Sequence, residues 1–256
     1  MKVLVVADIH YSLRQFDWLL QQGPRYDVVI IAGDLLDLAA HVDMDTQVVV
    51  VNKYLAKLAT LVPVVVSSGN HDLDSRDAAG ERVAAWMQDL RYEGISIDGD
   101  HVRLPGALIT VCPWWDGPIA REALEKLLRE THRPEDGPWI WIHHGPPSGS
   151  PVSWTGKADA GDSNLTELIG RWGPDFVLSG HIHDSPFRRG GSWVDRVGRA
   201  WVFNPGRQIG PYPAFIELDL AARTATWISL AGQEDKALDD AAVSPSPAPP
   251  VSSAPG

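Results

Sequence analysis

Five short clusters of aspartate, asparagine and histidine each follow a run of apolar residues. The clusters are Asp8-Ile9-His10, Gly33-Asp34-Leu35-Leu36-Asp37, Gly69-Asn70-His71-Asp72, His143-His144-Gly145-Pro146-Pro147 and Gly180-His181-Ile182-His183. Carboxylates and imidazoles together suit manganese, iron or zinc ions. A strand that ends in such a residue, repeated five times, indicates an open α/β sheet that collects ligands at the carboxyl edge of its strands.

Buried strands and helices must alternate in the first half of the chain to position these clusters. The sequence predicts strands over residues 3–7, 28–32 and 62–67, and helices over 12–22, from Asp43 to Thr60, and over 78–90. The second helix contains a strand-forming valine run, but its apolar residues recur at three- and four-residue spacing, which predicts one core face. That face comprises Val48, Val51, Leu55, Leu58 and Val62. The alternation predicts a parallel sheet.

Shorter strands and turns are predicted from about residue 94 onward. Strands over 95–97, 101–104 and 107–111 are expected to form a meander, followed by a helix over 119–130. Two buried strands, 139–142 and 176–179, are separated by a loop rich in glycine and serine and a helix near 164–172. Residues 200–204, 214–220 and 224–230 are predicted to be successive antiparallel strands.

Composition predicts one large domain and a tail. The chain has 256 residues, of which 44% are hydrophobic, enough for a substantial core. We expect one domain over residues 1–232, and disorder over 233–256, where an acidic patch precedes a segment rich in proline, serine and alanine. The net charge of −11 argues against a broad nucleic-acid surface or an acidic-membrane surface. A phosphorylated substrate stays compatible, because bound metal ions can supply local positive charge.

The sequence also predicts a cytoplasmic protein. The single cysteine, Cys112, cannot form an intrachain disulfide and suits a reducing compartment. Met1-Lys2 runs directly into a short strand, and no apolar run reaches the length of a secretory signal or a membrane span. The oligomeric state stays open.

Taken in order, the five clusters resemble those of the calcineurin-like metallophosphoesterases, and the resemblance extends from residue 3 to about residue 220. It implies two packed mixed β-sheets flanked by helices, a four-layer α/β/β/α sandwich. It also implies a hydrolase of phosphate esters that uses two divalent or mixed-valence ions of manganese, iron or zinc. Two metal ions ~3.5–4 Å apart can hold a bridging hydroxide as the nucleophile and neutralise charge on the phosphoryl oxygens.

The resemblance also implies a ligand set. One ion would take Asp8, His10, Asp34 and His183, and the other would take Asp34, Asn70, His144 and His181. His144 is favoured over His143 because it directly precedes Gly145-Pro146-Pro147, as in the family's His-Gly-Pro-Pro form.

His71 resembles the family's proton donor, with Asp37 holding the other ring nitrogen. A carboxylate behind an imidazole raises its basicity and fixes its tautomer. The alternative is structural, in which Asp37 caps a helix and His71 only packs.

Differences between this sequence and the family's better-known members reduce the number of activities that the resemblance allows. Protein Ser/Thr phosphatases continue the second cluster with Arg-Gly and end the third with glutamate, whereas this chain has Leu38-Ala39 and Asp72. The later Gly161-Asp162-Ser163-Asn164-Leu165 and Asn204-Pro205-Gly206 look more like the small phosphodiesterase branch. We therefore expect a phosphodiesterase acting on a small phosphorylated substrate, with a nucleotide as one candidate. A phosphomonoesterase of small molecules and a catalytically silent scaffold are the alternatives.

Two further groups of residues have both a functional and a structural interpretation. The paired indoles of Trp114 and Trp115 are able to stack on a nucleobase, although such tryptophans more often pack in a core or a lid. Arg188, Arg189 and Arg207 lie near the last histidines in sequence and are able to contact phosphate, although surface arginines are common.

Overall fold

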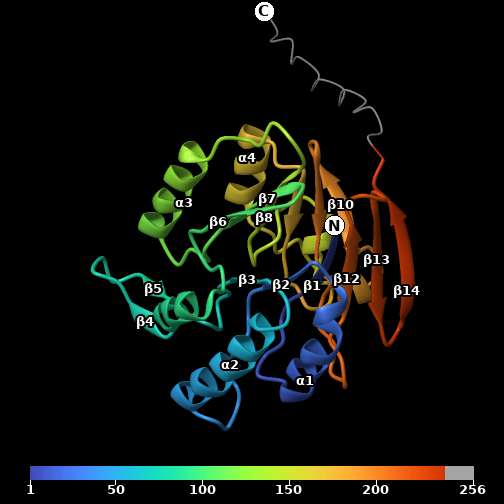
Figure 1. The fold of residues 1–256 in the computed structure, drawn as a ribbon. Coiled ribbons are helices and arrows are strands. Elements are labelled where there is room, and N and C mark those ends of the chain that lie inside the picture. The colour runs from blue at the N-terminus through green and yellow to red at the C-terminus, as the bar shows by residue number, and fades with distance from the viewer. Residues whose placement is uncertain (240–256) are drawn as a thin grey trace, which may run out of the picture.

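The structure, a computed structural model, describes residues 1–239 (Figure 1). Its first sheet has the strand order β14-β13-β12-β1-β2-β3. These strands are β1 (Lys2–Val6), β2 (Val28–Ala32), β3 (Val64–Ser67), β12 (Phe215–Asp219), β13 (Thr224–Ser229) and β14 (Gly232–Ala237). The strands β1, β2 and β3 are parallel, as their alternation with helices predicts, and β12 runs antiparallel to β1.

The second sheet has the strand order β10-β11-β9-β8-β7-β6. Its strands are β6 (His101–Leu104), β7 (Ala107–Val111), β8 (Trp139–Ile142), β9 (Phe176–Leu178), β10 (Val194–Val197) and β11 (Ala200–Phe203). The four central strands are parallel, and β6 and β10 are antiparallel edge strands. Both sheets are therefore mixed, as expected.

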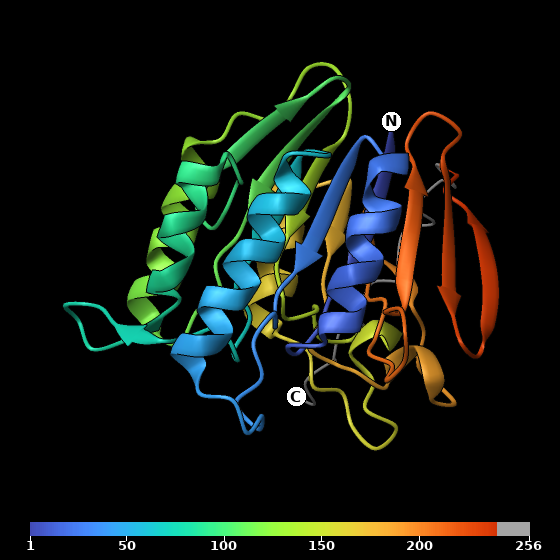
Figure 2. The same ribbon diagram turned by 60° about the horizontal axis from the view of Figure 1, so that its bottom comes forward.

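Helices cover the outer face of each sheet. The helices α1 (Leu13–Gln22) and α2 (Met44–Ala59) lie side by side on the first sheet (Figure 2), and α3 (Pro118–Glu130) and α4 (Ser163–Trp172) cover the second. Three apolar cores fill the spaces between the layers. Leu4 and Leu55 represent the core under α1 and α2, Ile30 and Ile140 the core between the sheets, and Trp141 and Leu165 the core under α3 and α4. This arrangement confirms the four-layer α/β/β/α expectation.

The helix α2 follows its predicted pattern. Asp43 caps its first turn by accepting the Thr46 N–H at 2.9 Å. Val51, Leu55 and Leu58 are buried in the core under α1 and α2, and Val48 is partly buried beside them. Tertiary burial of one face thus outweighs the unfavourable valine run. No helix within residues 1–239 combines the length and apolar character needed to cross a bilayer.

The helix predicted over residues 78–90 is wrong. The chain instead forms a short hairpin of β4 (Ser75–Arg76) and β5 (Arg82–Val83), followed by the 3₁₀ segment η2 (Ala85–Glu93). The Asp77 carboxylate accepts the N–H groups of Ala79 and Glu81, and Gly80 takes a positive φ of 85°. These turn interactions compete successfully with helical hydrogen bonds.

Two predicted pairings also differ. Residues 95–97 do not join a meander; they form only an isolated parallel bridge between Ser96 and Val65 of β3. The strand β11 belongs to the second sheet, where it pairs with β9 and with β10, a strand that the sequence did not predict. The polar residues in β10, Asp195 and Arg196, hide its strand pattern. Remaining 3₁₀ turns are η1 (Gly23–Arg25), η3 (Pro151–Ser153) and η4 (Ser185–Phe187).

The folded part extends past the predicted boundary at residue 232. Residues of β14 pair with β13 along its length, although all six of them are exposed. Leu238 then enters the core between the sheets with 1% of its surface exposed. A polar edge strand needs only backbone pairing, so composition alone could not reveal it. The rest of the predicted disordered tail, 240–256, lies outside the described residues.

We predict that Leu238→Ala lowers the free energy of unfolding by about 2–5 kcal/mol, because it removes a buried side chain. The control is Gln233→Ala on the exposed β14, which should change this quantity by less than about 0.5 kcal/mol. Urea unfolding followed by circular dichroism measures both. Equal midpoints for wild type and Leu238→Ala would show that this segment does not contribute to the core.

Candidate metal centre

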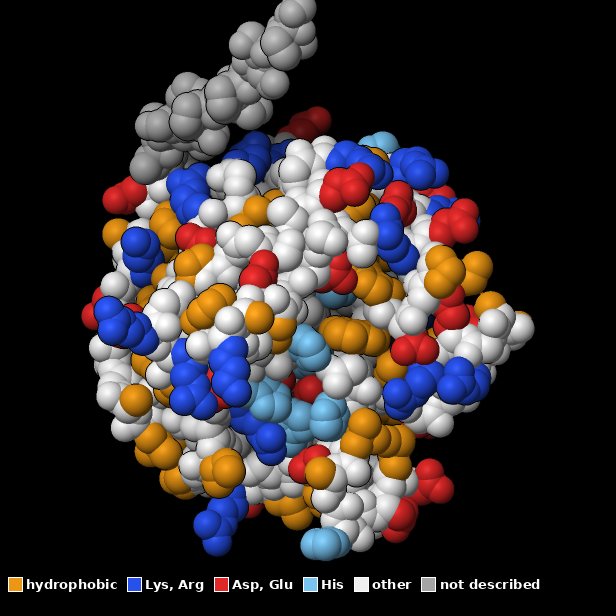
Figure 3. Space-filling view, turned by 180° about the vertical axis from the view of Figure 1, so that it is seen from behind, with side chains coloured by type: hydrophobic (Ala, Val, Ile, Leu, Met, Phe, Trp, Pro, Cys, Tyr) orange, Lys and Arg blue, Asp and Glu red, His pale blue; other side chains and the backbone are white. Residues whose placement is uncertain are grey.

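The five predicted clusters meet at one edge of the two sheets. Each follows β1, β2, β3, β8 or β9 at the carboxyl end of the strand. Figure 3 shows the result as a hollow in which histidine side chains surround carboxylates, with lysine or arginine side chains along one side. The loops are tied directly to one another, since the N–H of Asp8 donates to Gly33 and the N–H of Gly180 donates to His144. The structure thus places all five clusters at the carboxyl edge of the strands, where the sequence predicts them.

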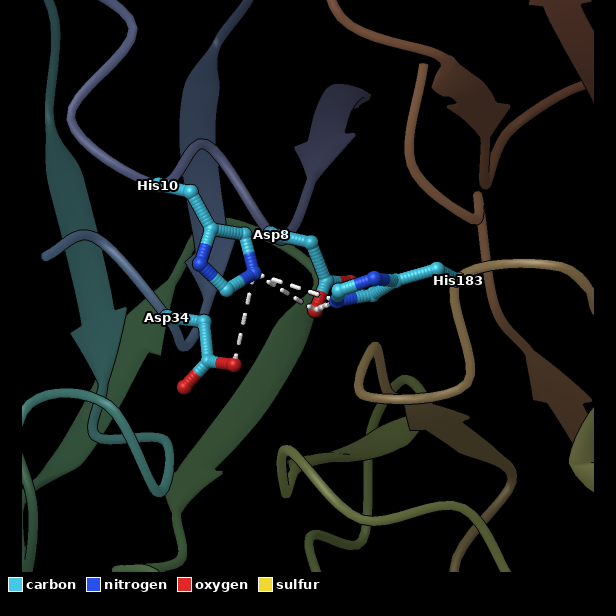
Figure 4. Close-up of side chains that lie close together, drawn as sticks. All are labelled: Asp8, His10, Asp34 and His183. Carbon is cyan, nitrogen blue, oxygen red and sulfur yellow. Dashed lines mark hydrogen bonds and ion pairs between the residues drawn. The ribbon is translucent and has the colours of Figure 1, made fainter. Parts of the chain in front are cut away.

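The first group of candidate ligands is Asp8, His10, Asp34 and His183, with one ligand-type atom of each within 4.8 Å of the others (Figure 4). His10 Nε2 lies 3.5 Å from Asp34 Oδ2 and 3.1 Å from His183 Nε2. His183 Nε2 lies 3.2 Å from Asp8 Oδ1. Four side chains from three loops therefore point at one small volume.

The second group is Asp34, His144 and His181, again within 4.8 Å. His144 Nε2 lies 3.2 Å from Asp34 Oδ2, and Asn70 Oδ1 lies 2.9 Å from His181 Nδ1. The structure thus brings together all seven residues predicted as metal ligands. Asp34 belongs to both groups.

The two neighbouring histidines face different surroundings. The Nδ1–H of His144 donates to the carbonyl oxygen of Ala32 at 2.7 Å, which directs Nε2 toward Asp34. His143 instead bonds the carbonyl oxygen of Gly145 through Nδ1 and packs against Trp115, with 4.2 Å between ring centroids. Burial lowers the pKa of His143 to about 4. This geometry favours His144 as the ligand, in agreement with the sequence motif.

The donor set fits transition-metal ions. Nε2 of His144, the ring nitrogen that faces Asp34, is buried and has no hydrogen-bond partner among residues 1–239. A metal-ligating histidine typically gives its other N–H to a backbone carbonyl or a carboxylate, as His144 does. The combination of carboxylates, imidazoles and one amide suits manganese, iron or zinc.

Burial and mutual attraction shift the pKa values of the aspartates and histidines in the cluster. Burial opposes ionisation, but hydrogen bonds and charge from the imidazoles hold the pKa of Asp8 and Asp34 below the ordinary value. Burial also disfavours imidazolium, yet the charge of Asp34 raises the pKa of His144 to about 9. At His181 burial prevails and lowers the pKa to about 4.

Unusual backbone conformations aim several of these side chains. Asp8, His10, Asp34 and His181 all have positive φ, between 45° and 67°. This region is uncommon for residues other than glycine and costs on the order of 1–3 kcal/mol per residue. The surrounding contacts must over-determine these conformations, which is typical of functional sites.

Three glycines allow the candidate ligands to approach the backbone. A Cβ atom on Gly33 would lie within 3.0 Å of His144, one on Gly69 within 3.0 Å of Asp34, and one on Gly180 within 3.0 Å of Asp8. Each glycine directly precedes another candidate ligand in sequence. The recurrence of glycine before Asp34, Asn70 and His181 thus has a steric cause.

Two buried residues outside the predicted site hold its loops. The Asp72 carboxylate accepts four backbone N–H groups at 2.8–3.0 Å, from Asp34, Leu35, Leu36 and Gly69. Burial and the charge of Asp34 raise its pKa to about 7. The Asn204 amide donates to the carbonyl oxygens of Val152 and Ile182 and so fixes the loop after β9. The only sequence signals were an aspartate next to His71 and an Asn-Pro-Gly turn.

The two predicted catalytic residues are close together but not bonded as expected. His71 Nδ1 accepts the Leu38 N–H at 3.3 Å, while Asp37 Oδ1 accepts the Ala39 N–H at 2.9 Å. Asp37 does not cap α2, a role that Asp43 fills. One ligand-type atom each of His10, Asp37 and His71 still lies within 4.8 Å of the others. The expected hydrogen bond is replaced because Asp37 closes a local turn.

Within residues 1–239, the side chains of the predicted arginines make no hydrogen bond or ion pair with the candidate ligands. Arg188 pairs with the neighbouring Asp184 at 3.2 Å. Arg207 approaches the site through its backbone, whose N–H donates to the carbonyl oxygen of His183.

A family model for calcineurin-like phosphoesterases matches residues 1–185. The fold is similar to that of TT1561 from Thermus thermophilus, with a TM-score of 0.56, 16% identity, and coverage of 93% of this chain and 99% of that one. It is also similar to purple acid phosphatase PPD1 from seeds of yellow lupin (Lupinus luteus), with a TM-score of 0.53 and 15% identity. That match covers 89% of this chain and 50% of the lupin protein. No match was found among curated proteins.

We predict that Asp72→Asn lowers the free energy of unfolding by roughly 2–4 kcal/mol. The NH₂ group of the new amide would face backbone N–H groups that the carboxylate accepts, and donors in this buried site would be left unpaired. Asp77→Asn is the matched control, since Asp77 also accepts backbone N–H groups but lies in the partly exposed β4–β5 turn. Chemical unfolding of both variants measures the difference. Equal losses would contradict a special role for burial at Asp72.

Proposed function

The chain belongs to the calcineurin-like phosphoesterase family, and we propose that it hydrolyses phosphate esters of small molecules, diesters above all, with two bound transition-metal ions. The observation that carries the proposal is the position of Asp34. Its carboxylate belongs to both groups of candidate ligands, because Oδ2 lies 3.5 Å from His10 Nε2 in the first group and 3.2 Å from His144 Nε2 in the second. A carboxylate shared in this way would hold both cations.

The chain's own residues would hold the two ions. Asp8, His10, Asp34 and His183 form one set, and Asp34, Asn70, His144 and His181 form the other. When bound, such a pair supplies positive charge to phosphoryl oxygens and lowers the pKa of a water molecule. Backbone groups orient the carboxylates, because the His71 N–H donates to Asp34 Oδ1 and the His181 N–H donates to Asp8.

His71 is the proposed proton donor to the leaving oxygen. Its ring is half-buried and lies edge-on to His10, with 4.6 Å between centroids. Donation requires the imidazolium form, in which Nδ1 also carries a proton and cannot accept the Leu38 N–H. Burial lowers the pKa of His71, and the charges of Asp34 and Asp37 oppose this effect. The protonated Nδ1 would therefore lose its hydrogen bond from the Leu38 N–H and donate to the nearby Asp37 carboxylate instead. In this role Asp37 is a positioning residue.

The preference for diesters rests on charge. Leu38-Ala39 follows Asp37, so the chain lacks an arginine at the position where protein phosphatases carry one. A monoester dianion has more negative charge to neutralise than a diester monoanion. Figure 3 also shows lysine or arginine side chains along one side of the histidine cluster, which supports a phosphomonoesterase as the second candidate.

We predict about two transition-metal ions per chain in protein reconstituted with Mn²⁺, and loss of ester hydrolysis after chelation. Asp34→Asn should hold one ion or none, because both groups share this carboxylate. His41→Ala, a substitution of an exposed histidine outside the groups, should bind as wild type does. Elemental analysis after gel filtration measures the ratio. Hydrolysis by metal-free protein would contradict the proposal, and two bound ions without hydrolysis of any ester would indicate a silent scaffold.

We predict that His71→Ala loses far more rate on an alkyl ester than on a nitrophenyl ester. Protonating an ordinary alkoxide leaving group accelerates cleavage by about 10²–10⁴-fold, whereas a nitrophenolate leaves without such help. Asp37→Asn should show the same selectivity in milder form. The measurement is the ratio of the two rates at equal metal occupancy. A purely structural His71 would slow both substrates by one factor and leave that ratio unchanged.

A further inference from the structure

A cleft of about 330 Å³ opens beside the candidate metal centre, lined by Trp114, Gly145, His181 and residues 160–164. We propose that this cleft binds a nucleobase, stacked on Trp114, and that the substrate is therefore an ester of a nucleotide. This inference rests on the proposed function, because it assigns a substrate class to the same site.

The structure separates the roles of the two neighbouring tryptophans. Trp115 donates its indole N–H to Asp162 Oδ2 at 2.8 Å and packs against the core under α3 and α4. Trp114 belongs to none of the three apolar cores of residues 1–239 and lines the cleft. Trp115 is thus held by a hydrogen bond and by the core. The ring of Trp114 stacks on that of His143, with 6.2 Å between centroids, and the part of it that stays exposed lines the cleft.

The position of Trp114 is fixed relative to the candidate ligands. Its backbone N–H donates to Ser68 Oγ at 3.0 Å, and the Ser68 N–H donates to Asp98 Oδ1 at 2.9 Å. The centroid of its ring lies 5.2 Å from the ring centroid of His181 and 5.7 Å from that of His144. A base stacked on a ring held in this way would keep its phosphate near the centre without a large loss of side-chain entropy.

The polar groups of the cleft suit the edge of a base rather than a second phosphate. The Asp162 carboxylate already accepts the N–H groups of Asn164 and Leu165 and the indole N–H of Trp115, so the start of α4 is capped by a negative charge. Within residues 1–239, the side chains of Ser163 and Asn164 make no hydrogen bond. An asparagine amide offers a donor and an acceptor together, as base edges require.

The size of the cleft is consistent with this ligand. A volume near 330 Å³ lies at the lower end of the range for small-molecule sites. An alkyl chain placed there would cover the Asn164 amide without bonding it, which is unfavourable. A heterocyclic ring satisfies both the indole face and the amide.

The experiment compares two diesters with the same leaving group, adenosine 5′-(4-nitrophenyl) phosphate and methyl 4-nitrophenyl phosphate, on the metal-loaded protein. We expect a higher kcat/KM for the adenosine ester. Trp114→Leu should reduce the ratio of the two values about tenfold, within the range of base–aromatic stacking. Trp114→Phe should retain most of the preference, and Asn164→Leu should lower it. Glu167→Gln, on an exposed part of α4, is the control.

Calorimetry of adenosine 5′-monophosphate and methyl phosphate, with metal-loaded and metal-free protein, gives a readout independent of turnover. Weaker binding of the adenosine compound to Trp114→Leu, with methyl phosphate unaffected, supports the cleft assignment even if no ester is hydrolysed. Hydrolysis of both esters with a ratio unchanged by Trp114→Leu would overturn the assignment and leave the phosphoesterase proposal standing. Equal binding of both compounds by wild type would also overturn it.

Discussion

Placing the Asp8 and Asp34 carboxylates side by side in a buried site is the constraint on which the rest of the structure depends. Both residues are 1% exposed, and buried charges are costly unless they are paired and hydrogen-bonded. Imidazole nitrogens and the backbone N–H groups of His71 and His181 offset the cost of burying these two charges. They come together because loops from both sheets meet at the edge of the parallel strands. Bound cations would complete this compensation, so that metal binding and the packing of the two sheets would support each other.

The same constraint accounts for the residues around the carboxylates. Close approach leaves no room for side chains at Gly33, Gly69 and Gly180. Positive φ values aim Asp8 and Asp34 inward, and Asp72 holds the loops after β2 and β3 in register. The backbone strain is thus distributed over several loops, each stabilised by contacts with another loop rather than by its own sequence.

Sequence alone predicted those features that burial and strand order determine. Each strand that ends in a candidate ligand was found from its apolar run, and the residues of the two groups followed from a family resemblance. Errors arose where local polar bonds decide the conformation. Asp77 converts a predicted helix into a hairpin, Asp37 bonds Ala39 instead of His71, and β14 is held by backbone pairing that leaves no pattern. The difference between Trp114 and Trp115 needed the position of Asp162, which is distant in sequence.

The contact between Asp8 and the loop after β9 joins residues 173 positions apart. The strand β1 likewise lies between β2, which follows it closely, and β12, which is synthesised much later. Non-local contacts of this kind must overcome loop-closure entropy, and they tend to slow folding. A growing chain on the ribosome therefore carries Asp8, His10 and Asp34 long before His144, His181 and His183 exist. The assembled centre would then be a late event of folding, and metal uptake would mark a chain whose two sheets have already come together.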